Sequence, residues 1–363
     1  MSQKNTQSVK WRYLEVKEKE VPRCNAIHAA LARGVDLGIS PNTVFAEECP
    51  DYVLSLGRNQ CPEEEIDIKA CRTLGIKIER RDTGGGAGLM VPGSTSWGVC
   101  VPMSHSLVSH DMPENIKTFS DGVVKGLRIL GLDASFSPVN DIDVSGKKIG
   151  GITALMRGRA LLVYGSVIWD FDAEKWMQIS KAPLVKLEKK GVSSVQKRVT
   201  TLTQELGERI APSRIRRALK KGFEQSLQIT LEESPLSAAE KQIWEEEIQR
   251  FSSKEFVLRP RHPCRLRLGK YAHPSEKGII ITSVYLFEGK VVDIGISGDF
   301  MQIDDVDIQE LTTVLFGLPA EREYIEKAVA EFFTEQNCTL LGTTPQDFTE
   351  AIMGAISAFQ QAQ

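Results

Sequence analysis

Apolar residues recur along the chain with two different spacings, and these spacings predict where helices and strands lie. Repeats of three and four residues are typical of amphipathic helices, and they occur at 25–33, 63–74, 113–130, 237–250, 308–316, 321–333 and 346–359. Short apolar or alternating runs are typical of strands, and they occur at 52–56, 76–80, 97–101, 160–171 and as a hairpin within 278–300. The run 160–171 is apolar almost throughout, which indicates a strand buried on both faces.

These elements, spread over 363 residues, predict an α+β protein with two domains. We expect a larger mixed α/β domain over residues 1–235, a helical linker over 236–260 and a small α+β domain over 261–363. Ser237 and Glu240 form a capping-box pattern at the start of the linker helix. The small domain carries no evident catalytic cluster, so we expect it to act as a lid or as a partner surface.

Composition and charge argue against several classes of protein. The chain is 41% hydrophobic and 26% charged, which is typical of a globular protein. Its net charge of −3 argues against broad electrostatic binding, so we expect no nucleic-acid partner and no membrane partner. The seven cysteines include no CxxC pair, and no uncharged apolar run reaches the length of a membrane span. We therefore expect a cytoplasmic protein.

The segment 138–151, PVNDIDVSGKKIGG, is the first candidate for chemistry. It places Lys147 and Lys148 after a tight Ser-Gly turn, and neighbouring side chains of a strand point to opposite faces. We expect Lys148 to face a site, because the glycines after it let a ligand approach the backbone and because Asn140 and Asp141 lie a few residues upstream. The alternative is a solvated β-hairpin with charged ends.

The segment 80–88, RRDTGGGAG, is the second candidate. Successive backbone N–H groups in such a run can bind an anion, and an arginine can donate two parallel hydrogen bonds to a phosphate or a carboxylate. The run is not a P-loop, because no Gly-Lys-Ser or Gly-Lys-Thr follows it. It is not a dinucleotide-binding fingerprint either, because a strand at 97–101 follows instead of a helix. The alternative is a flexible hairpin loop.

A series of motifs resembles the lipoate-protein ligases in its order and separations. The motifs are GRNQ at 57–60, RRDTGGGA at 80–87, NDI and GKKI between 140 and 149, and KGVSSV and RVT between 190 and 200. The tail, with GDF at 298–300 and LFG at 315–317, is similar to the small C-terminal domain of that family. The resemblance implies a large mixed-sheet catalytic domain of the biotin/lipoyl ligase type, followed by a small α+β accessory domain.

The same resemblance implies an ATP-dependent acylation in two steps. Lipoate and ATP would give lipoyl-AMP and pyrophosphate, and the lipoyl group would then pass to a lysine of a lipoyl carrier domain. The implied cofactors are ATP and Mg²⁺, and the implied small substrate is lipoate or octanoate. In the first step a carboxylate attacks an anionic phosphate, so a fixed lysine and backbone N–H groups would lower the repulsion.

The resemblance also implies which residues form the site. Lys148 would be the catalytic residue, and Asp141 would hold Mg²⁺ near the phosphates. The nucleotide would contact Arg81, Gly85, Gly86, Ala87, Gly88, Leu89, Asn140, Asp141 and Lys148. Lipoate would contact Arg58, Gly84, Gly85, Lys148, Gly151 and Gly165.

A departure from the family pattern and a related reaction leave two other functions open. Met90-Val91 stands where the family has a His-Asp pair, so one alternative is a homologue that binds lipoyl groups and nucleotide without turnover. The other alternative is an octanoyl or lipoyl transferase that uses no ATP. Such a transferase needs a reactive cysteine, and the nearest cysteine before the lysine segment is Cys100.

Overall fold

The computed structural model describes residues 9–18, 20–181, 198–259 and 269–362. The chain forms two compact units. The first unit comprises Met1–Val53, Met90–Asp172 and Ser193–Phe251, and the second comprises Leu54–Leu89, Ala173–Val192 and Ser252–Gln363. The segment Leu54–Leu89 thus belongs to the same compact unit as the C-terminal residues. The domain limits expected from the sequence stay a prediction.

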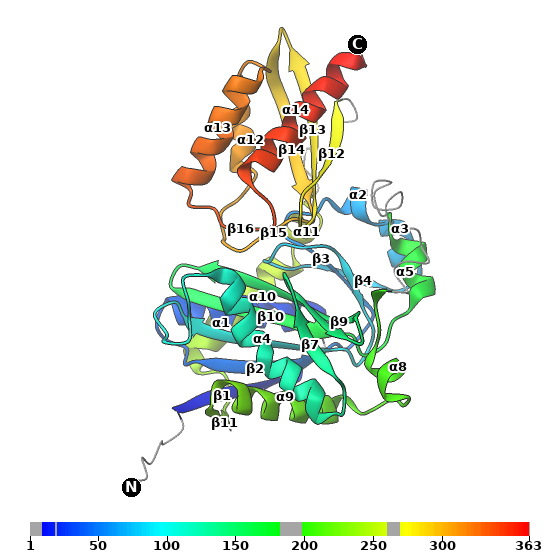
Figure 1. Cartoon of the computed structure of the whole chain (residues 1–363), viewed down its shortest axis with the longest axis vertical. Helices are drawn as coiled ribbons and strands as arrows, with labels where there is room; N and C mark the ends of the chain where they lie inside the picture. Colours follow the sequence, from blue (N-terminus) through cyan, green and yellow to red (C-terminus); the bar gives the residue numbers. More distant parts are fainter. Residues whose placement is uncertain (1–8, 19, 182–197, 260–268, 363) are drawn as a thin grey trace. The chain divides into compact units, whose positions relative to one another are not determined.

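A mixed sheet is the centre of the first unit (Figure 1). Its strands are β1 Val9–Val16, β2 Thr43–Glu48, β6 Thr95–Pro102, β7 Ala134–Ser137, β8 Asp141–Val144, β9 Lys147–Arg157, β10 Ala160–Val167 and β11 Ile229–Glu233. They form an eight-stranded sheet in the order β11-β1-β2-β6-β10-β9-β8-β7. β1 pairs in parallel with β2 and β11, and the other neighbours are antiparallel. Every residue of β10 except Ser166 is buried, which confirms the predicted doubly buried strand over 160–167. The strand is shorter than predicted, because residues 168–171 lie outside it.

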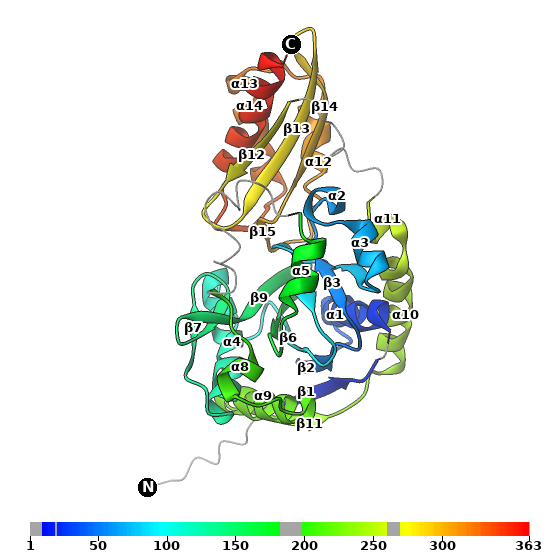
Figure 2. The ribbon, with the colours of Figure 1, turned by 90° about the vertical axis from the view of Figure 1, so that its right-hand side faces the viewer.

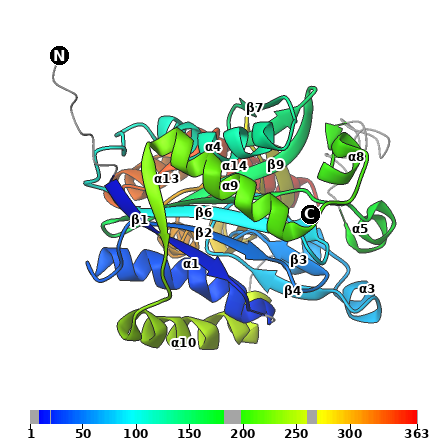
Figure 3. The same cartoon turned by 90° about the horizontal axis from the view of Figure 1, so that it is seen from below.

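Helices cover both faces of this sheet (Figure 3). One face carries α1 Val21–Asp36 and α10 Ala238–Ser252, and the other carries α4 Met112–Ile129 and α9 Pro212–Leu227. α4 and α9 approach closely at glycines. A Cβ atom on Gly122 would lie 2.2 Å from the ring of Phe223, and one on Gly222 would lie 2.1 Å from the carbonyl oxygen of Gly122. Larger residues at these two positions would therefore force the helices apart.

Helix α10 is fixed to the first unit by a buried ion pair. Arg12 on β1 donates two hydrogen bonds to Glu240, at 2.8 and 2.5 Å, and these two side chains are only 4% and 1% exposed. Ser40 donates a third hydrogen bond to the same carboxylate at 2.6 Å. Burial alone would raise the pKa of Glu240, but its hydrogen bonds outweigh burial and lower the pKa to about 2.

A second, smaller sheet lies in the second unit. Its strands are β3 Val53–Leu56, β4 Lys77–Arg80 and β5 Gly88–Met90, and they are arranged in the order β4-β3-β5. The same unit contains the short helices α2 Pro62–Glu65, α3 Ile68–Thr73, α5 Ala173–Ile179 and α11 Lys254–Val257. The turns that follow β3 and β4 carry the arginine and glycine motifs recognised in the sequence.

The predicted helix over 63–74 is two helices, α2 and α3. The break lies at Ile66, which is extended and forms a β-bridge with Ser180. Asp67 then caps α3 by accepting a hydrogen bond from the Ala70 N–H at 2.9 Å. The sequence pattern missed the break because the apolar spacing continues through it.

The C-terminal part of the second unit is an antiparallel sheet packed against helices (Figure 2). Its elements are β12 Lys270–Pro274, β13 Ile279–Phe287, β14 Lys290–Gly298, β15 Met301–Gln302, α12 Glu310–Leu315, α13 Arg322–Glu335, β16 Leu340–Leu341 and α14 Pro345–Gln361. α14 packs on β12 and β13, and α13 packs on α14. One continuous apolar core joins the sheet to the three helices. The predicted hairpin and the three predicted helices are confirmed.

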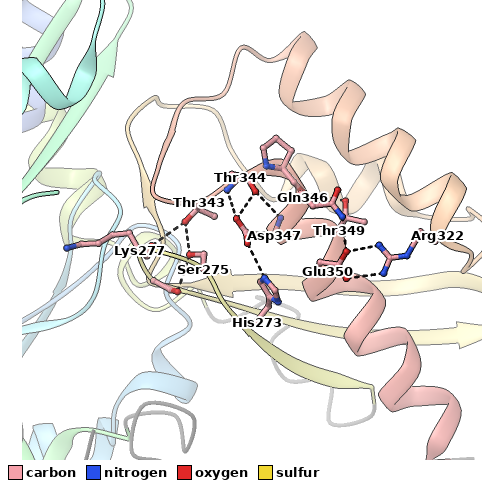
Figure 4. Close-up of polar contacts among 12 residues, drawn as sticks. His273, Ser275, Lys277, Arg322, Thr343, Thr344, Gln346, Asp347, Thr349 and Glu350 are labelled. Atoms are coloured by element: carbon pink, nitrogen blue, oxygen red, sulfur yellow. Dashed lines mark hydrogen bonds and ion pairs between the residues drawn. The ribbon is translucent and has the colours of Figure 1, made fainter. Parts of the chain in front are cut away.

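Polar side chains fix the beginning of α14 to the neighbouring elements (Figure 4). Asp347 accepts hydrogen bonds from the Thr344 N–H and hydroxyl, both at 2.7 Å, and it lies 3.1 Å from Nε2 of His273 on β12. Glu350 accepts two hydrogen bonds from Arg322 on α13, at 2.7 and 2.9 Å. These contacts connect β12, α13 and α14, so the polar groups named here have a structural role.

No helix in the described part of the chain is long and apolar enough to cross a membrane.

Candidate functional site

Lys148 and Asp141 form an ion pair at one end of the β8–β9 hairpin. The two strands turn at Ser145 and Gly146, whose φ angles of 52° and 74° lie in the left-handed region that tight hairpins require. The Lys148 Nζ lies 2.7 Å from Asp141 Oδ1, and the two side chains are 37% and 24% exposed. Lys147 is exposed to solvent. Lys148 is therefore held by a carboxylate yet remains accessible to a ligand.

Glycines line the backbone beside this lysine. A Cβ atom on Gly151 would lie 3.3 Å from the Lys148 Nζ. A Cβ atom on Gly165 would lie 2.1 Å from the carbonyl oxygen of Gly151, so β9 and β10 could not pair as they do with any larger residue there. The glycines keep the space beside the lysine free of side chains.

Asn140 offers an unused acceptor next to the ion pair. Its side-chain N–H donates to the carbonyl oxygen of Ile152 at 2.6 Å, and its own carbonyl oxygen accepts from the Ile152 N–H at 2.8 Å. The residue is 9% exposed, and its Oδ1 has no hydrogen-bond partner among the described residues. A buried acceptor without a partner is unfavourable, which makes this oxygen a candidate ligand contact.

Thr200 supports Lys148 from a distant part of the chain. The Thr200 N–H donates to the Lys148 carbonyl oxygen at 2.8 Å, and the Thr200 hydroxyl donates to Glu205 at 2.5 Å. The next residue, Thr201, caps helix α8 (Leu202–Leu206). Thr200 was not among the predicted site residues, although it belongs to the RVT motif on which the family resemblance partly rests.

Arg81, in the second unit, shapes the glycine loop. Its guanidinium donates to the carbonyl oxygens of Gly84 at 2.9 Å and Gly86 at 2.8 Å, and to that of Ser55 at 3.2 Å. Gly85, between these carbonyls, has a φ of 89°, which a larger residue rarely adopts. In this conformation, Arg81 therefore braces the loop through its own backbone.

Arg80, the other arginine of the motif, is entirely buried. One terminal nitrogen donates to three carbonyl oxygens within 57–60, and its Nε donates to the last carbonyls of α11. Burial lowers the pKa of Arg80 to about 9. The first arginine of the pair is thus a structural residue that fixes the turn bearing Arg58.

The predicted site residues fall into two groups. Asn140, Asp141, Lys148, Gly151 and Gly165 belong to the first unit, where the hairpin brings the first three together with Gly151. The other group belongs to the second unit and comprises Arg58, Arg81, Gly84, Gly85, Gly86, Ala87, Gly88 and Leu89. The union of the two groups in one active site stays a prediction.

Met90, which departs from the family pattern, belongs to an apolar cluster of the first unit. It packs on the buried residues Val21, Cys49 and Val53. The neighbouring Val91 is 4% exposed. A His-Asp pair at these positions would place polar groups in apolar surroundings. The apolar side chains of Met90 and Val91 suit these surroundings better.

Cys100 does not have the surroundings of a nucleophile. The side chain lies within β6 and is 0% exposed. Burial raises the pKa of its thiol to about 12, so the thiol stays protonated near neutral pH.

The oxygens of Asp141 and Asn140 are the protein groups that suit a magnesium ion in this hairpin. No cluster of three or more His, Cys, Asp or Glu side chains that could hold a metal occurs among the described residues. Mg²⁺ keeps several waters and is often bound by one or two carboxylates together with substrate phosphates. Two oxygens from adjacent residues fit that mode of binding.

The large mixed sheet with the lysine hairpin, together with the small α+β C-terminal part, defines a fold of the lipoyl ligase class. Residues 23–224 match the family described as the lipoyl protein ligase A/B catalytic domain, and residues 270–352 match the C-terminus of bacterial lipoate protein ligases. The chain belongs to this lipoyl protein ligase A/B family, whose members include both lipoate-protein ligases and octanoyltransferases.

Curated relatives carry both activities in their names. A probable lipoate-protein ligase A of Mycoplasma pneumoniae is 27% identical over 82% of this chain and 84% of its own length. The octanoyltransferase LipM of Clostridioides difficile is 24% identical over 68% of this chain and 97% of its own length.

Solved structures agree in fold. A bi-partite lipoate protein ligase from Thermoplasma acidophilum, solved with its E2 lipoyl domain, is 26% identical with a TM-score of 0.62, covering 69% of this chain and 96% of that one. A lipoate-protein ligase A bound with ATP is 26% identical with a TM-score of 0.60, covering 69% of this chain and 99% of that one. The expected family and the expected fold class are confirmed.

Proposed function

We propose that this protein is an ATP-dependent lipoate-protein ligase. In the first step an oxygen of the lipoate carboxylate attacks the α-phosphorus of ATP, a P–O bond forms, and pyrophosphate leaves. In the second step the neutral amine of a carrier lysine attacks the acyl carbon. The C–N bond forms, AMP leaves, and the amine loses a proton.

The observation that carries the proposal is the pairing of Lys148 with Asp141 beside Gly151. The ion pair fixes the Lys148 Nζ at 2.7 Å from the Asp141 carboxylate. A fixed positive charge beside bare backbone stabilises the negative charge that accumulates when a carboxylate meets a phosphate. We assign Lys148 to the α-phosphate and to the developing charge on the acyl oxygen.

Neighbouring residues have supporting roles in the proposal. Asp141 and the Asn140 Oδ1 would hold Mg²⁺, which neutralises charge on the phosphates of the bound nucleotide. The Thr200 N–H fixes the backbone of Lys148. The glycine loop and Arg81 of the second unit would bind the nucleotide, and Arg58 with Gly84, Gly85, Gly151 and Gly165 would contact lipoate.

The C-terminal region of the chain favours a ligase over a transferase. The match to LipM covers nearly all of that enzyme but only 68% of this chain, whereas residues 270–352 match the C-terminus of lipoate protein ligases. A ligase-type C-terminal region therefore lies beyond the catalytic match. The relative solved with ATP and the relative solved with its lipoyl domain support the assignment of nucleotide and carrier.

An octanoyltransferase is the second candidate, because several relatives carry that name. It requires a cysteine thiolate that takes the acyl group from a carrier as a thioester and releases the carrier thiol, and an acceptor amine that then takes the acyl group and releases the thiolate. The high pKa of Cys100 argues against that cysteine as the nucleophile.

Pyrophosphate release tests the proposal. The purified full-length chain is mixed with MgATP and either lipoate or octanoate, and pyrophosphate is measured against reactions that lack the acid or the nucleotide. We expect release only when acid and nucleotide are both present. Binding of these compounds without any pyrophosphate would instead support the homologue without turnover. Acyl transfer without ATP that alkylating agents abolish would support the transferase.

A further inference from the structure

Within the second unit, residues 299–305 contact the Arg58 turn and the glycine loop. The Arg58 guanidinium donates to the carbonyl oxygen of Asp304 at 2.9 Å and to that of Asp305 at 2.5 Å. The Gly85 N–H donates to the carbonyl oxygen of Phe300 at 3.1 Å. Two donors expected to bind the substrate anions are thus occupied by backbone oxygens of the C-terminal part. We refer to residues 299–305 as the latch.

The latch has a fixed shape because a buried carboxylate organises it. Asp304 is 7% exposed. Its side chain accepts hydrogen bonds from the Gln302 side chain at 2.7 Å, from the Val306 N–H at 3.0 Å and from the Thr339 N–H. The two carbonyl oxygens that face Arg58 are therefore presented by a rigid turn.

A buried amide pair connects the latch to the arginine turn. The Asn59 side chain donates to Gln302 Oε1 at 2.9 Å, and these residues are 2% and 1% exposed. The backbone adds a bond from the Gly298 N–H to the Asn59 carbonyl oxygen at 3.0 Å. A Cβ atom on Gly84 would lie 2.6 Å from the Gln302 nitrogen, so the contact also needs a glycine in the loop.

We propose that the latch is an autoinhibitory contact that closes the Arg58 turn and the glycine loop to anionic ligands. A carbonyl oxygen and an anionic oxygen compete for the same donors, so a bound anion and a closed latch exclude each other. By linkage, whatever opens the latch strengthens anion binding, and a bound anion favours the open latch. The inference rests on the proposed function, which supplies the identity of the competing anion. This anion is either the carboxylate of the acyl substrate or a phosphate of the nucleotide.

Calorimetry on the full-length chain tests the inference, with MgATP alone and octanoate alone as probes. Gln302→Ala removes the bond to Asn59. Gln309→Ala is the matched control, because among the described residues the Gln309 side chain donates within the C-terminal part, to the Ile296 carbonyl oxygen at 2.8 Å. We expect Gln302→Ala to bind at least one probe about three- to tenfold more tightly than wild type. The control should bind like wild type. The probe that gains affinity identifies the anion that competes with the latch.

Hydrogen exchange provides a second readout, and Asn59→Ala removes the same bond from the other side if Gln302→Ala folds poorly. Without ligand, peptides covering 57–60, 84–86 and 299–305 should exchange faster in the variant than in wild type. Ligand added to wild type should increase exchange in 299–305. Ligand that protects 299–305, unchanged affinity in a folded variant, or no binding by either protein would overturn the latch. Tight binding without pyrophosphate release would count against the proposed function alone.

Discussion

At the residue scale, two neighbouring lysines of the β8–β9 hairpin have different surroundings. Lys147 and Lys148 are adjacent in sequence, and only Lys148 lies 2.7 Å from Asp141. Lys147 is exposed at the end of the hairpin. The sequence could predict that the two side chains diverge, because alternation along a strand requires it. It could not predict the partner of Lys148, because the register of β8 against β9 shifts at a bulge between Ile142 and Asp143.

Replacing each lysine in turn distinguishes a specific role of Lys148 in the reaction from a general effect of positive charge nearby. Lys148→Ala should lower the rate of acid-dependent pyrophosphate release by about 100-fold, because it removes the fixed charge that offsets the repulsion between carboxylate and phosphate. Lys147→Ala removes the same charge one residue away and should leave the rate close to that of wild type. Equal losses in the two variants would show that general positive charge, and not Lys148, is what matters.

The arginine pair shows what the sequence could not resolve at this scale. Both arginines precede the glycine run, and either could have been a ligand for an anion. The Arg80 guanidinium donates its hydrogen bonds to carbonyl oxygens of the protein backbone. The Arg81 guanidinium donates to carbonyl oxygens of the glycine loop. A buried arginine such as Arg80 leaves no periodic signal in the sequence, because its partners are backbone atoms of two segments, 57–60 and 256–257.

At the scale of single elements, helix α10 is joined to the first unit through Glu240. The folded state lowers the pKa of this carboxyl group from 4.5 to about 2. The stabilisation is therefore present in full above pH 4.5 and is lost as the pH falls towards 2. A difference of this size corresponds to on the order of 3 kcal/mol.

Glu240→Gln should therefore reduce the free energy of unfolding near pH 7 by on the order of 3 kcal/mol. The variant should also lose less stability than wild type between pH 5 and pH 3, because its residue 240 does not titrate. Urea unfolding at a series of pH values measures both effects. Glu245→Gln on the same helix is the control, since its ion pair with Arg23 is 59% exposed on the glutamate side and contributes little. The same loss in both variants would contradict a special role for the buried pair.

Long amphipathic elements were predictable, and short or strongly polar ones were not. The helices near 113–130 and 346–359 and the hairpin within 278–300 were predicted within a few residues, because their apolar spacing is regular. Helix α9 was missed because its exposed face is crowded with basic residues. Strands β1 and β11 were missed as well, although β1 is buried over most of its length and pairs in parallel with both of its neighbours.

At the scale of the whole molecule, the sequence predicted the family and the fold class. Family and fold class are confirmed by matches to both the catalytic region and the C-terminal region. No residue pattern indicated that residues 299–305 would contact the Arg58 turn, because the acceptors in that contact are largely backbone carbonyl oxygens. Contacts made by backbone atoms do not depend on residue type, so residue patterns do not reveal them.

The central claim is that Lys148 enables ATP-dependent transfer of an acyl group to a carrier lysine. Mass spectrometry of a lipoyl domain, incubated with this protein, MgATP and either lipoate or octanoate, tests that claim most directly. We expect the domain to gain the mass of one acyl group only when ATP is present, with Lys148→Ala slowing this gain by about 100-fold and Lys147→Ala leaving it close to wild type. An unmodified domain, or equal modification without ATP, would show that Lys148 does not serve an ATP-dependent transfer.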